Sequence, residues 1–198
     1  MAGITEMLAR WIEGGGRAIG QIRLAKADGG FVLCHAADEQ RADLADFSGA
    51  EAARDLAHFD DAGKFRPLKT ALNLRHGWRL QLADMTALRT ALDYFYPAMT
   101  GIWQSWSAGR LEPVSLRGTL GRQTGMYRVT QKITDEQAEA MVASFCAGCL
   151  KQRLWTLNGR QEIAIPDAPQ SFPLLCHEAC NLLVGKAREV VKQSAPPA

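Results

Sequence analysis

The sequence predicts an α+β fold with an amino-terminal lobe over residues 1–118 and a carboxy-terminal lobe over residues 119–198. Segments with apolar residues at helical spacing alternate with short apolar runs that flank turn-forming residues, a pattern typical of helices mixed with β-hairpins. The stretch 109–121, which contains glycines and Pro113, is typical of a seam between lobes. With 198 residues, 47% hydrophobic and 22% charged, the chain is long enough to form a packed core.

The amino-terminal lobe is expected to mix hairpins and helices. Apolar side chains over residues 4–13 recur at helical spacing, and three successive glycines end that segment. Asp28–Gly30 provides turn chemistry between two apolar runs, which predicts a hairpin. Ser48 and Glu51 have the spacing of a capping box, which predicts a helix that continues to about His58. The other elements expected in this lobe are a strand over 76–82 and a helix over 86–96 that ends before Pro97.

The carboxy-terminal lobe is expected to contain two cysteine-bearing helices that flank a β-hairpin. Its helix starts are marked by capping residues, and its turn by two residues that tolerate positive φ. The expected elements are a helix over 138–150 that Thr134 and Gln137 cap, a hairpin over 154–165 that turns at Asn158–Gly159, and a helix over 174–191 that Ser171 caps.

Four of the five cysteines fall in two close pairs, Cys146 with Cys149 and Cys176 with Cys180. Positions three or four apart on an α-helix share one face, so each pair can direct two sulfurs at a common centre. Four thiolates at one centre suit a 4Fe-4S cluster or a tetrahedral zinc ion, because both accept anionic sulfur ligands. The sequence therefore predicts that these four cysteines bind a metal cofactor.

The sequence favours iron and sulfur over zinc at this centre. Cys176 lies in the first turn of an expected helix, where the helix dipole favours a thiolate and an anionic cluster. Basic residues nearby in the sequence can offset the cluster's charge, namely Lys151, Arg153, Arg122, Arg128 and Lys132. The alternatives are a zinc-stabilised interaction module without redox activity, or four cysteines that pack as small apolar side chains.

A third hypothesis is an enzyme that acts on a tetrapyrrole, with Cys34 or His35 as its catalytic group. Its pocket would be lined by the aromatic residues Tyr94, Phe95, Tyr96, Trp103 and Trp106, although such a group more often belongs to the core. Adjacent strand residues point to opposite faces, so Cys34 and His35 are not expected to act on one atom. Cys34 is therefore expected to be a core residue.

Charge and composition argue against several kinds of partner. The chain has 23 basic and 21 acidic residues and a formal net charge of +2, which provides no strong field for nucleic acid or an anionic membrane. No apolar run reaches the roughly 18 residues of a membrane-spanning helix, and the first 16 residues do not resemble a signal peptide. We therefore expect a cytoplasmic protein, where cysteines suit metal binding better than disulfides.

Two motifs resemble a known family, Arg122-Gln-Thr-Gly-Met-Tyr-Arg128 and Cys146-Ala-Gly-Cys-Leu-Lys-Gln-Arg-Leu-Trp155. They are similar to the 4Fe-4S cluster-binding domains found carboxy-terminal to CbiX-type sirohydrochlorin cobaltochelatases. The similarity extends back through Arg66–Leu68, Trp78–Leu80 and Tyr94–Pro97, and so covers most of the chain.

The resemblance implies a 4Fe-4S cluster bound by Cys146, Cys149, Cys176 and Cys180. It also implies an electron-transfer or structural role linked to cobalamin or related tetrapyrrole biosynthesis. The sequence contains no chelatase domain, so metal insertion by this polypeptide alone is not expected. A separate chelatase or redox partner protein is the expected partner.

Overall fold

The computed structural model describes residues 3–60, 62–65, 74–162 and 170–194. The chain forms two compact units: unit 1 comprises residues 1–110 and 165–174, and unit 2 comprises residues 111–164 and 175–198. The first change of unit falls between Arg110 and Leu111, earlier than residue 118, because Leu116 is a fully buried core residue of unit 2. An α+β fold is confirmed.

Unit 1 is built on a mixed six-stranded sheet with the strand order β4-β5-β3-β2-β1-β7. Its centre is the expected hairpin, in which Ile22 pairs with His35 and Ala27 pairs with Gly30. Gly29 adopts a φ of 82°, a conformation that glycine adopts without strain, and so closes the turn. The strands are β1 (Ala18–Ile19), β2 (Ile22–Ala27), β3 (Gly30–His35), β4 (Ala45–Ser48), β5 (Trp78–Leu82) and β7 (Ser171–Phe172).

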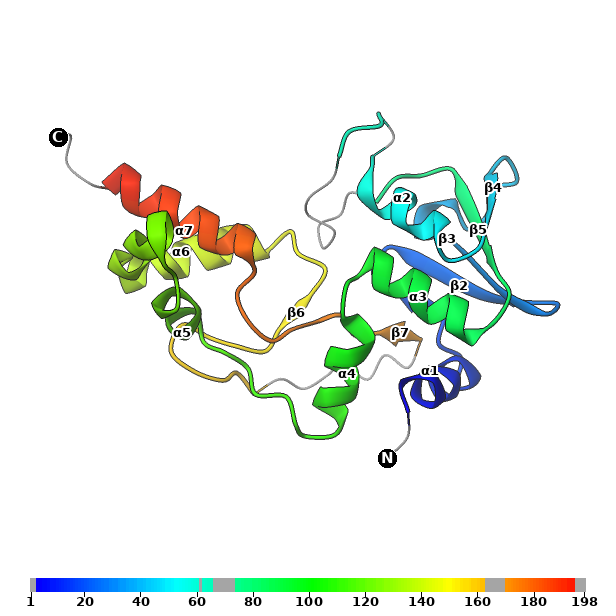
Figure 1. Ribbon diagram of the computed structural model, residues 1–198, viewed down its shortest axis with the longest axis horizontal. Coiled ribbons are helices and arrows are strands. Elements are labelled where there is room, and N and C mark those ends of the chain that lie inside the picture. The colour runs from blue at the N-terminus through cyan, green and yellow to red at the C-terminus, as the bar shows by residue number, and fades with distance from the viewer. Residues whose placement is uncertain (1–2, 61, 66–73, 163–169, 195–198) are drawn as a thin grey trace. The chain divides into compact units, whose positions relative to one another are not determined.

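Helix α3 packs on the sheet through β3 and β5, and the other α-helices of unit 1 contact α3 (Figure 1). The stacked rings of Trp78 and Phe95, whose centroids are 5.2 Å apart, join β5 to α3 in the core. Burial of two such large side chains is the main source of stability for this contact. The helices are α1 (Ile4–Glu13), the 3₁₀ segment η1 (Ala36–Asp38), α2 (Ala52–His58), α3 (Met85–Phe95) and α4 (Met99–Ser107).

Two expectations for the capping residues of unit 1 are wrong. Ser48 does not cap a helix but ends β4, in which Phe47 pairs with Leu80 of β5. Ser171 does not cap a helix either, since it lies in β7 and pairs with Ala18. In both cases pairing with a distant strand prevails over the local capping pattern, which a short sequence window cannot detect.

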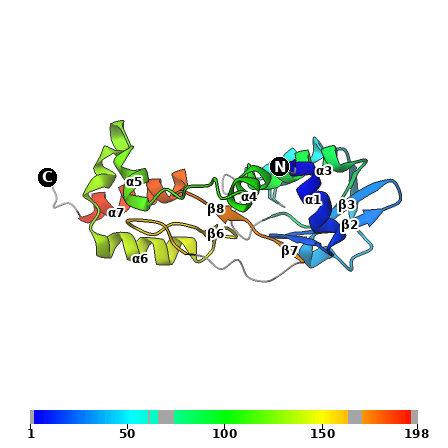
Figure 2. The same ribbon diagram turned by 90° about the horizontal axis from the view of Figure 1, so that it is seen from below.

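Unit 2 is mainly helical and contains a small sheet in which β6 and β8 are parallel (Figure 2). Thr134 and Gln137 form the predicted capping box at the start of α6, and α6 packs against α7. Its elements are α5 (Leu116–Gly121), η2 (Gly125–Lys132), α6 (Asp135–Cys146), β6 (Gln152–Arg153), β8 (Leu175–Cys176) and α7 (Asn181–Ser194). None of the helices in the described ranges is long and apolar enough to cross a bilayer.

The predicted helix over 174–191 begins seven residues too early, because α7 starts at Asn181. The preceding backbone is extended: Leu154 N–H donates to the Cys176 carbonyl at 2.9 Å, and Val114 N–H donates to the His177 carbonyl at 2.7 Å. These carbonyls are therefore used by other segments and not by a helix. Cys176 lies in a strand, so the expectation that each cysteine pair lies on one helix is wrong.

Part of the predicted hairpin over 154–165 is confirmed. The turn closes where Thr156 N–H donates to the Gly159 carbonyl at 2.8 Å, and Trp155 forms an isolated antiparallel bridge with Arg160. The end of its second strand, residues 163–165, lies outside the described residues, as does the motif Arg66–Leu68.

Candidate iron-sulfur centre

Three backbone elements of unit 2 hold the four paired cysteines. Cys146 is the last residue of α6, and Cys149 N–H donates to the Cys146 carbonyl at 3.1 Å in the turn that follows. Cys176 is held by β8, where it pairs with Arg153 of β6. Cys180 immediately precedes α7, and its carbonyl accepts the N–H of Val184 at 3.1 Å. The partial positive charge of this helix start favours an anionic group at Cys180.

The four thiols are close enough to perturb one another. Burial, reinforced by the charges of Cys149 and Cys176 and more weakly by that of Cys180, raises the pKa of Cys146 to about 11. Burial also raises the pKa of Cys176, while the indole of Trp155 and the charge of Lys151 offset part of the rise. A cationic core bound between these thiols would favour their thiolate forms, so loading the site releases protons.

Two N–H groups point at sulfur atoms of the centre. The Lys151 backbone N–H donates to Cys149 Sγ at 3.4 Å, and Trp155 Nε1–H donates to Cys176 Sγ at 3.4 Å. Hydrogen bonds of this kind stabilise thiolate ligands and raise the reduction potential of an iron–sulfur cluster. In the protonated form Cys176 Sγ itself donates to the Glu178 carbonyl at 3.0 Å.

The centre is buried on one side and open on the other. Cys146 and Cys176 pack against the core of unit 2, whereas Cys180 is exposed. An open hollow adjoins Cys146 and is rimmed by the basic side chains of Lys151 and Arg153. The core consists of Leu116, Leu120, Ile133, Ala138, Met141, Val142, Trp155, Ala179, Leu183, Val184 and Ala187.

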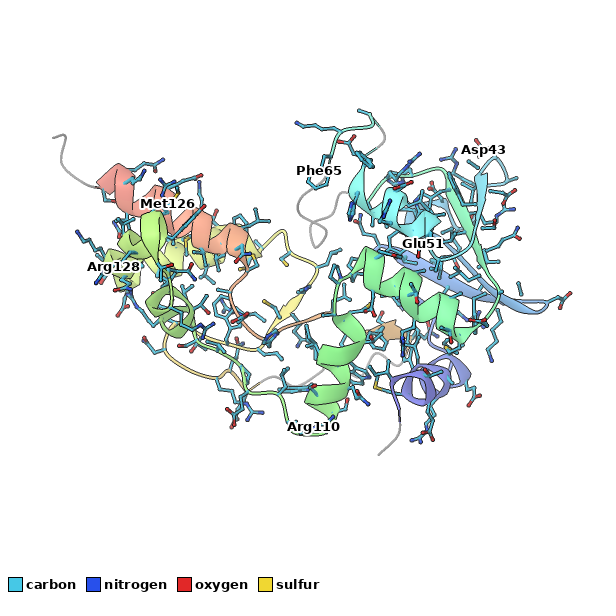
Figure 3. All side chains as sticks on the ribbon, in the orientation of Figure 1. Asp43, Glu51, Phe65, Arg110, Met126 and Arg128 are labelled. Atoms are coloured by element: carbon cyan, nitrogen blue, oxygen red, sulfur yellow. The ribbon has the colours of Figure 1, made fainter. Side chains whose placement is uncertain are left out.

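The basic residues predicted to offset a cluster's charge are not all placed beside the cysteines. Lys151 and Arg153 lie at the cysteines, and Arg153 also stacks over the Trp155 ring at 5.2 Å. Arg122 forms a 2.6 Å ion pair with Glu178, in the loop between Cys176 and Cys180. The other two residues, Arg128 and Lys132, lie on η2, where Figure 3 marks Arg128.

The four sulfurs are not drawn together as closely as the ligands around a bound zinc ion. Four thiolates around zinc at Zn–S distances of about 2.3 Å have sulfurs about 3.8 Å apart. Among the residues that the structure describes, no three of these sulfur atoms lie within 4.8 Å of one another. Four thiolates are the ligands that a 4Fe-4S cluster takes, so the donor set fits such a cluster.

The residues of the tetrapyrrole hypothesis do not form one site. Phe95 and Tyr96 are buried in the core of unit 1, whereas the Tyr94 hydroxyl bonds the exposed carboxylate of Glu51. Trp103 packs edge-on against Phe172. These aromatic side chains are therefore divided between the core and the surface.

Cys34 and His35 lie on opposite faces of β3, as expected. His35 is buried, with an exposed fraction of 4%. Cys34 is only partly buried, contrary to the expectation of a core residue. It lines a hollow together with arginine side chains, including Arg23 and Arg79. Burial nevertheless raises the pKa of the Cys34 thiol.

The residues that sequence reasoning missed at the centre are the hydrogen-bonding partners of the sulfurs. Trp155 ends the motif that begins at Cys146, but no pattern in the sequence indicated that its indole donates to Cys176. The parallel pairing of β6 with β8 sets this contact, because it aligns Arg153 with Cys176 and so places the next residues beside the sulfur.

Two family models match successive parts of the chain. The model of the DR2241 stabilising domain matches residues 4–107, more than half of the chain. The chain belongs to the DR2241 stabilising-domain family. A second model, the 4Fe-4S iron-sulfur cluster binding domain, matches residues 108–189 and so identifies a cluster-binding domain in the carboxy-terminal part of this family member. The expected iron–sulfur family and the 4Fe-4S cofactor are thereby confirmed.

A solved structure supports the assignment to the DR2241 family. It is DR2241 from Deinococcus radiodurans, described as a multi-domain protein with structural similarity to chelatases and two additional novel domains. The similarity has a TM-score of 0.81 at 33% sequence identity and covers 94% of this chain and 40% of that one. The present chain thus spans about two fifths of the length of DR2241. No curated protein matches the chain.

Proposed function

We propose that this chain is an electron-transfer protein whose 4Fe-4S cluster is bound by Cys146, Cys149, Cys176 and Cys180. The observation that supports it best is the group of four interacting thiols, exposed at Cys180, within the segment that matches the 4Fe-4S cluster binding domain. When bound, such a cluster supplies one-electron redox chemistry. The protein's residues hold it, tune its potential and present one side of it to solvent.

The assignment of the four ligands rests on which cysteines lie in the segment that matches the cluster-binding domain. A 4Fe-4S cluster needs four thiolate ligands. The segment that matches the cluster-binding domain contains these four cysteines and no others, since Cys34 lies outside it. Each of the four has a position fixed by backbone hydrogen bonds at the end of α6, in β8 or at the start of α7.

The exposure of Cys180 supports electron transfer. A redox centre that is buried on every side exchanges electrons poorly with a partner protein, whereas an exposed ligand allows close approach. Lys151 and Arg153 border the same centre and would attract an acidic surface on the partner. We therefore expect the redox partner to present a negatively charged patch to this centre.

The proposed partner is a chelatase of tetrapyrrole biosynthesis, such as the cobalamin pathway uses. Support comes from the two motifs similar to domains linked to cobaltochelatases, and from the structural similarity of DR2241 to chelatases. The chain would then supply electrons to a chelatase-type enzyme and would not itself insert the metal.

A structural role for the cluster is the second candidate function. Cys146 and Cys176 pack against the core of unit 2, next to Trp155, so that a bound cluster would join α6 to β8. Under this alternative the cluster holds the unit together and does not change its oxidation state.

Anaerobic purification and redox titration would separate these roles. We expect about four iron and four sulfide ions per chain, and a paramagnetic reduced state that returns to the oxidised state without loss of iron. A cluster that cannot be reduced reversibly would support the structural role. One zinc ion per chain and no sulfide would contradict both.

A further inference from the structure

Unit 1 contains a compact group of metal-ligating side chains that the proposed function does not use. Among the described residues, His35, Asp38 and His76 form the group whose ligand atoms all lie within 4.8 Å of one another. Asp38 Oδ1 is 3.6 Å from His76 Nδ1, and the imidazole centroids of His35 and His76 are 3.8 Å apart. Two imidazoles and one carboxylate are typical ligands of zinc and of other divalent transition metals.

We propose that His35, Asp38 and His76 bind one divalent transition-metal ion, such as zinc, independently of the four cysteines. Open zinc sites have three protein ligands and leave a further position to water or a small ligand. His35, Asp38 and His76 match such open zinc sites in the number and the type of their ligands. Its members belong to unit 1, whereas the cysteines belong to unit 2.

The backbone holds the three side chains in place before any ion binds. His35 ends β3, and its Nδ1 accepts the N–H of Ala37 at 3.1 Å at the start of η1. Asp38 ends η1, and its Oδ2 accepts the N–H of Gly77 at 2.7 Å, which links it to the residue after His76. The network therefore joins three segments, and little side-chain freedom remains to be lost on binding.

Burial differs among the three ligands in the way an open site requires. The exposed fraction is 4% for His35 and 3% for the Asp38 side chain, but 46% for the His76 side chain. Two ligands are thus shielded from water, and the third lies at the opening through which an ion can enter. A carboxylate this deeply buried needs a cationic or hydrogen-bonding partner, which distinguishes Asp38 from an ordinary surface acid.

Existing hydrogen bonds of these side chains would compete with the ion. Arg41 Nη1 donates to Asp38 Oδ1 at 3.2 Å, and Ala37 N–H occupies the lone pair of His35 Nδ1. Arg41 is also held by Asp43, through Nε at 3.0 Å and Nη2 at 2.8 Å, so it keeps a carboxylate partner if Asp38 turns to a metal. Asp43 lies in the loop that leads to β4 (Figure 3).

The side chain of Gln21 contacts the imidazole of His35. Its Nε2 is 3.3 Å from His35 Nε2, the ring nitrogen that Ala37 does not contact. A second polar contact of Gln21, from the Leu74 N–H to Oε1 at 3.0 Å, fixes that side chain.

The test uses the cluster-loaded full chain with Zn²⁺ alone as the probe, so that the cysteine thiolates are already occupied. Calorimetry with metal analysis should show one zinc bound per chain with the iron retained. Zinc K-edge X-ray absorption should show only nitrogen and oxygen ligands, at about 2.0–2.2 Å. His76→Ala, at the exposed ligand, should weaken zinc binding at least tenfold.

His58→Ala provides the matched control, because it removes a histidine of the same unit from the end of α2 and should leave zinc affinity unchanged. Asp38→Asn is a second test, accompanied by circular dichroism to confirm folding. The proposal is overturned if no zinc binds, if its ligands are sulfur at about 2.3 Å, or if folded His76→Ala binds zinc as tightly as the parent protein.

Discussion

The two candidate metal sites of this chain differ in both ligand type and spacing. In unit 1, nitrogen and oxygen ligands lie within 4.8 Å of one another, close enough to meet around one ion. In unit 2, no three of the four described cysteine sulfurs lie within that distance of one another. The comparison teaches that ligand type points to two different inorganic groups: imidazole and carboxylate suit a single divalent ion, whereas four thiolates in a segment that matches a cluster-binding domain suit an iron–sulfur cluster.

The sites also differ in what secures their ligands. In unit 1, backbone N–H groups hold two of the ligands: the N–H of Ala37 donates to His35, and the N–H of Gly77, next to His76, donates to Asp38. These residues belong to a sheet that has its own core. Cys176 and Cys146 are instead part of the margin of a small helical core. Loss of the inorganic group should therefore disturb unit 2 far more than unit 1.

The largest effect is expected from Cys176→Ser. This sulfur is the ligand that packs into the core and accepts the Trp155 N–H, and a hydroxyl is a poor ligand for iron. The variant should lose most of its iron and visible absorption after anaerobic purification. Cys34→Ser is the control and should retain both. If Cys34→Ser loses the cluster and Cys176→Ser keeps it, the ligand assignment is wrong.

Removal of the cluster by an iron chelator should affect the two units unequally. Amide hydrogen exchange should accelerate at least tenfold in α6 and α7, because the proposed ligands Cys146 and Cys180 lie at the ends of these helices. Exchange in the β2–β3 hairpin should remain unchanged. Equal acceleration in both units would show that the cluster also supports unit 1, so that the two units would not differ in their dependence on the cluster.

A smaller effect is expected from Trp155→Phe, which deletes one N–H···S hydrogen bond and keeps an aromatic ring in the core. Since one such bond contributes about 0.5–1.5 kcal/mol, the reduction potential should fall by about 20–60 mV. Protein-film voltammetry would measure it. Trp106→Phe, in α4 of unit 1, should leave the potential unchanged. A potential unaffected by Trp155→Phe would show that this contact does not tune the cluster.

The smallest expected effect is on the folding stability of unit 1, at a residue that lies in neither candidate metal site. Burial raises the pKa of Asp93, and the Thr100 hydrogen bond offsets only part of the rise. A folded state that holds this proton more tightly loses stability as the pH rises above the unfolded pKa of about 3.9. Asp93→Asn should therefore raise the free energy of unfolding at pH 7 and have little effect below about pH 4.

Chemical denaturation at both pH values would measure this difference. Asp28→Asn, in the exposed hairpin turn, is the control and should show no comparable pH dependence. Equal behaviour of the two variants would mean that the carboxylate of Asp93 is not destabilising.

Local signals in the sequence predicted those elements that local interactions determine. The β2–β3 hairpin follows from Asp28–Gly30, and the start of α6 follows from Thr134 and Gln137, because each device acts within a few residues. The four paired cysteines also stood out through their spacing alone.

The structural features that the sequence did not predict depend on pairing between distant segments. Ser48 and Ser171 look like caps but belong to strands, and Cys176 looks helical but pairs with β6. The group of His35, Asp38 and His76 forms only once β3 and β5 pair side by side, as Cys34 and Arg79 do. No local pattern relates such positions.

Strand β7 has a consequence for the order in which this protein can mature during synthesis. Phe172 completes the edge of unit 1 beside Trp11 and Trp103, and only a few residues later come Cys176 and Cys180, half of the proposed sulfur ligands of unit 2. A nascent chain that ends before this stretch lacks an essential piece of both units. Cofactor insertion that uses all four cysteines must therefore await synthesis of the chain through Cys180.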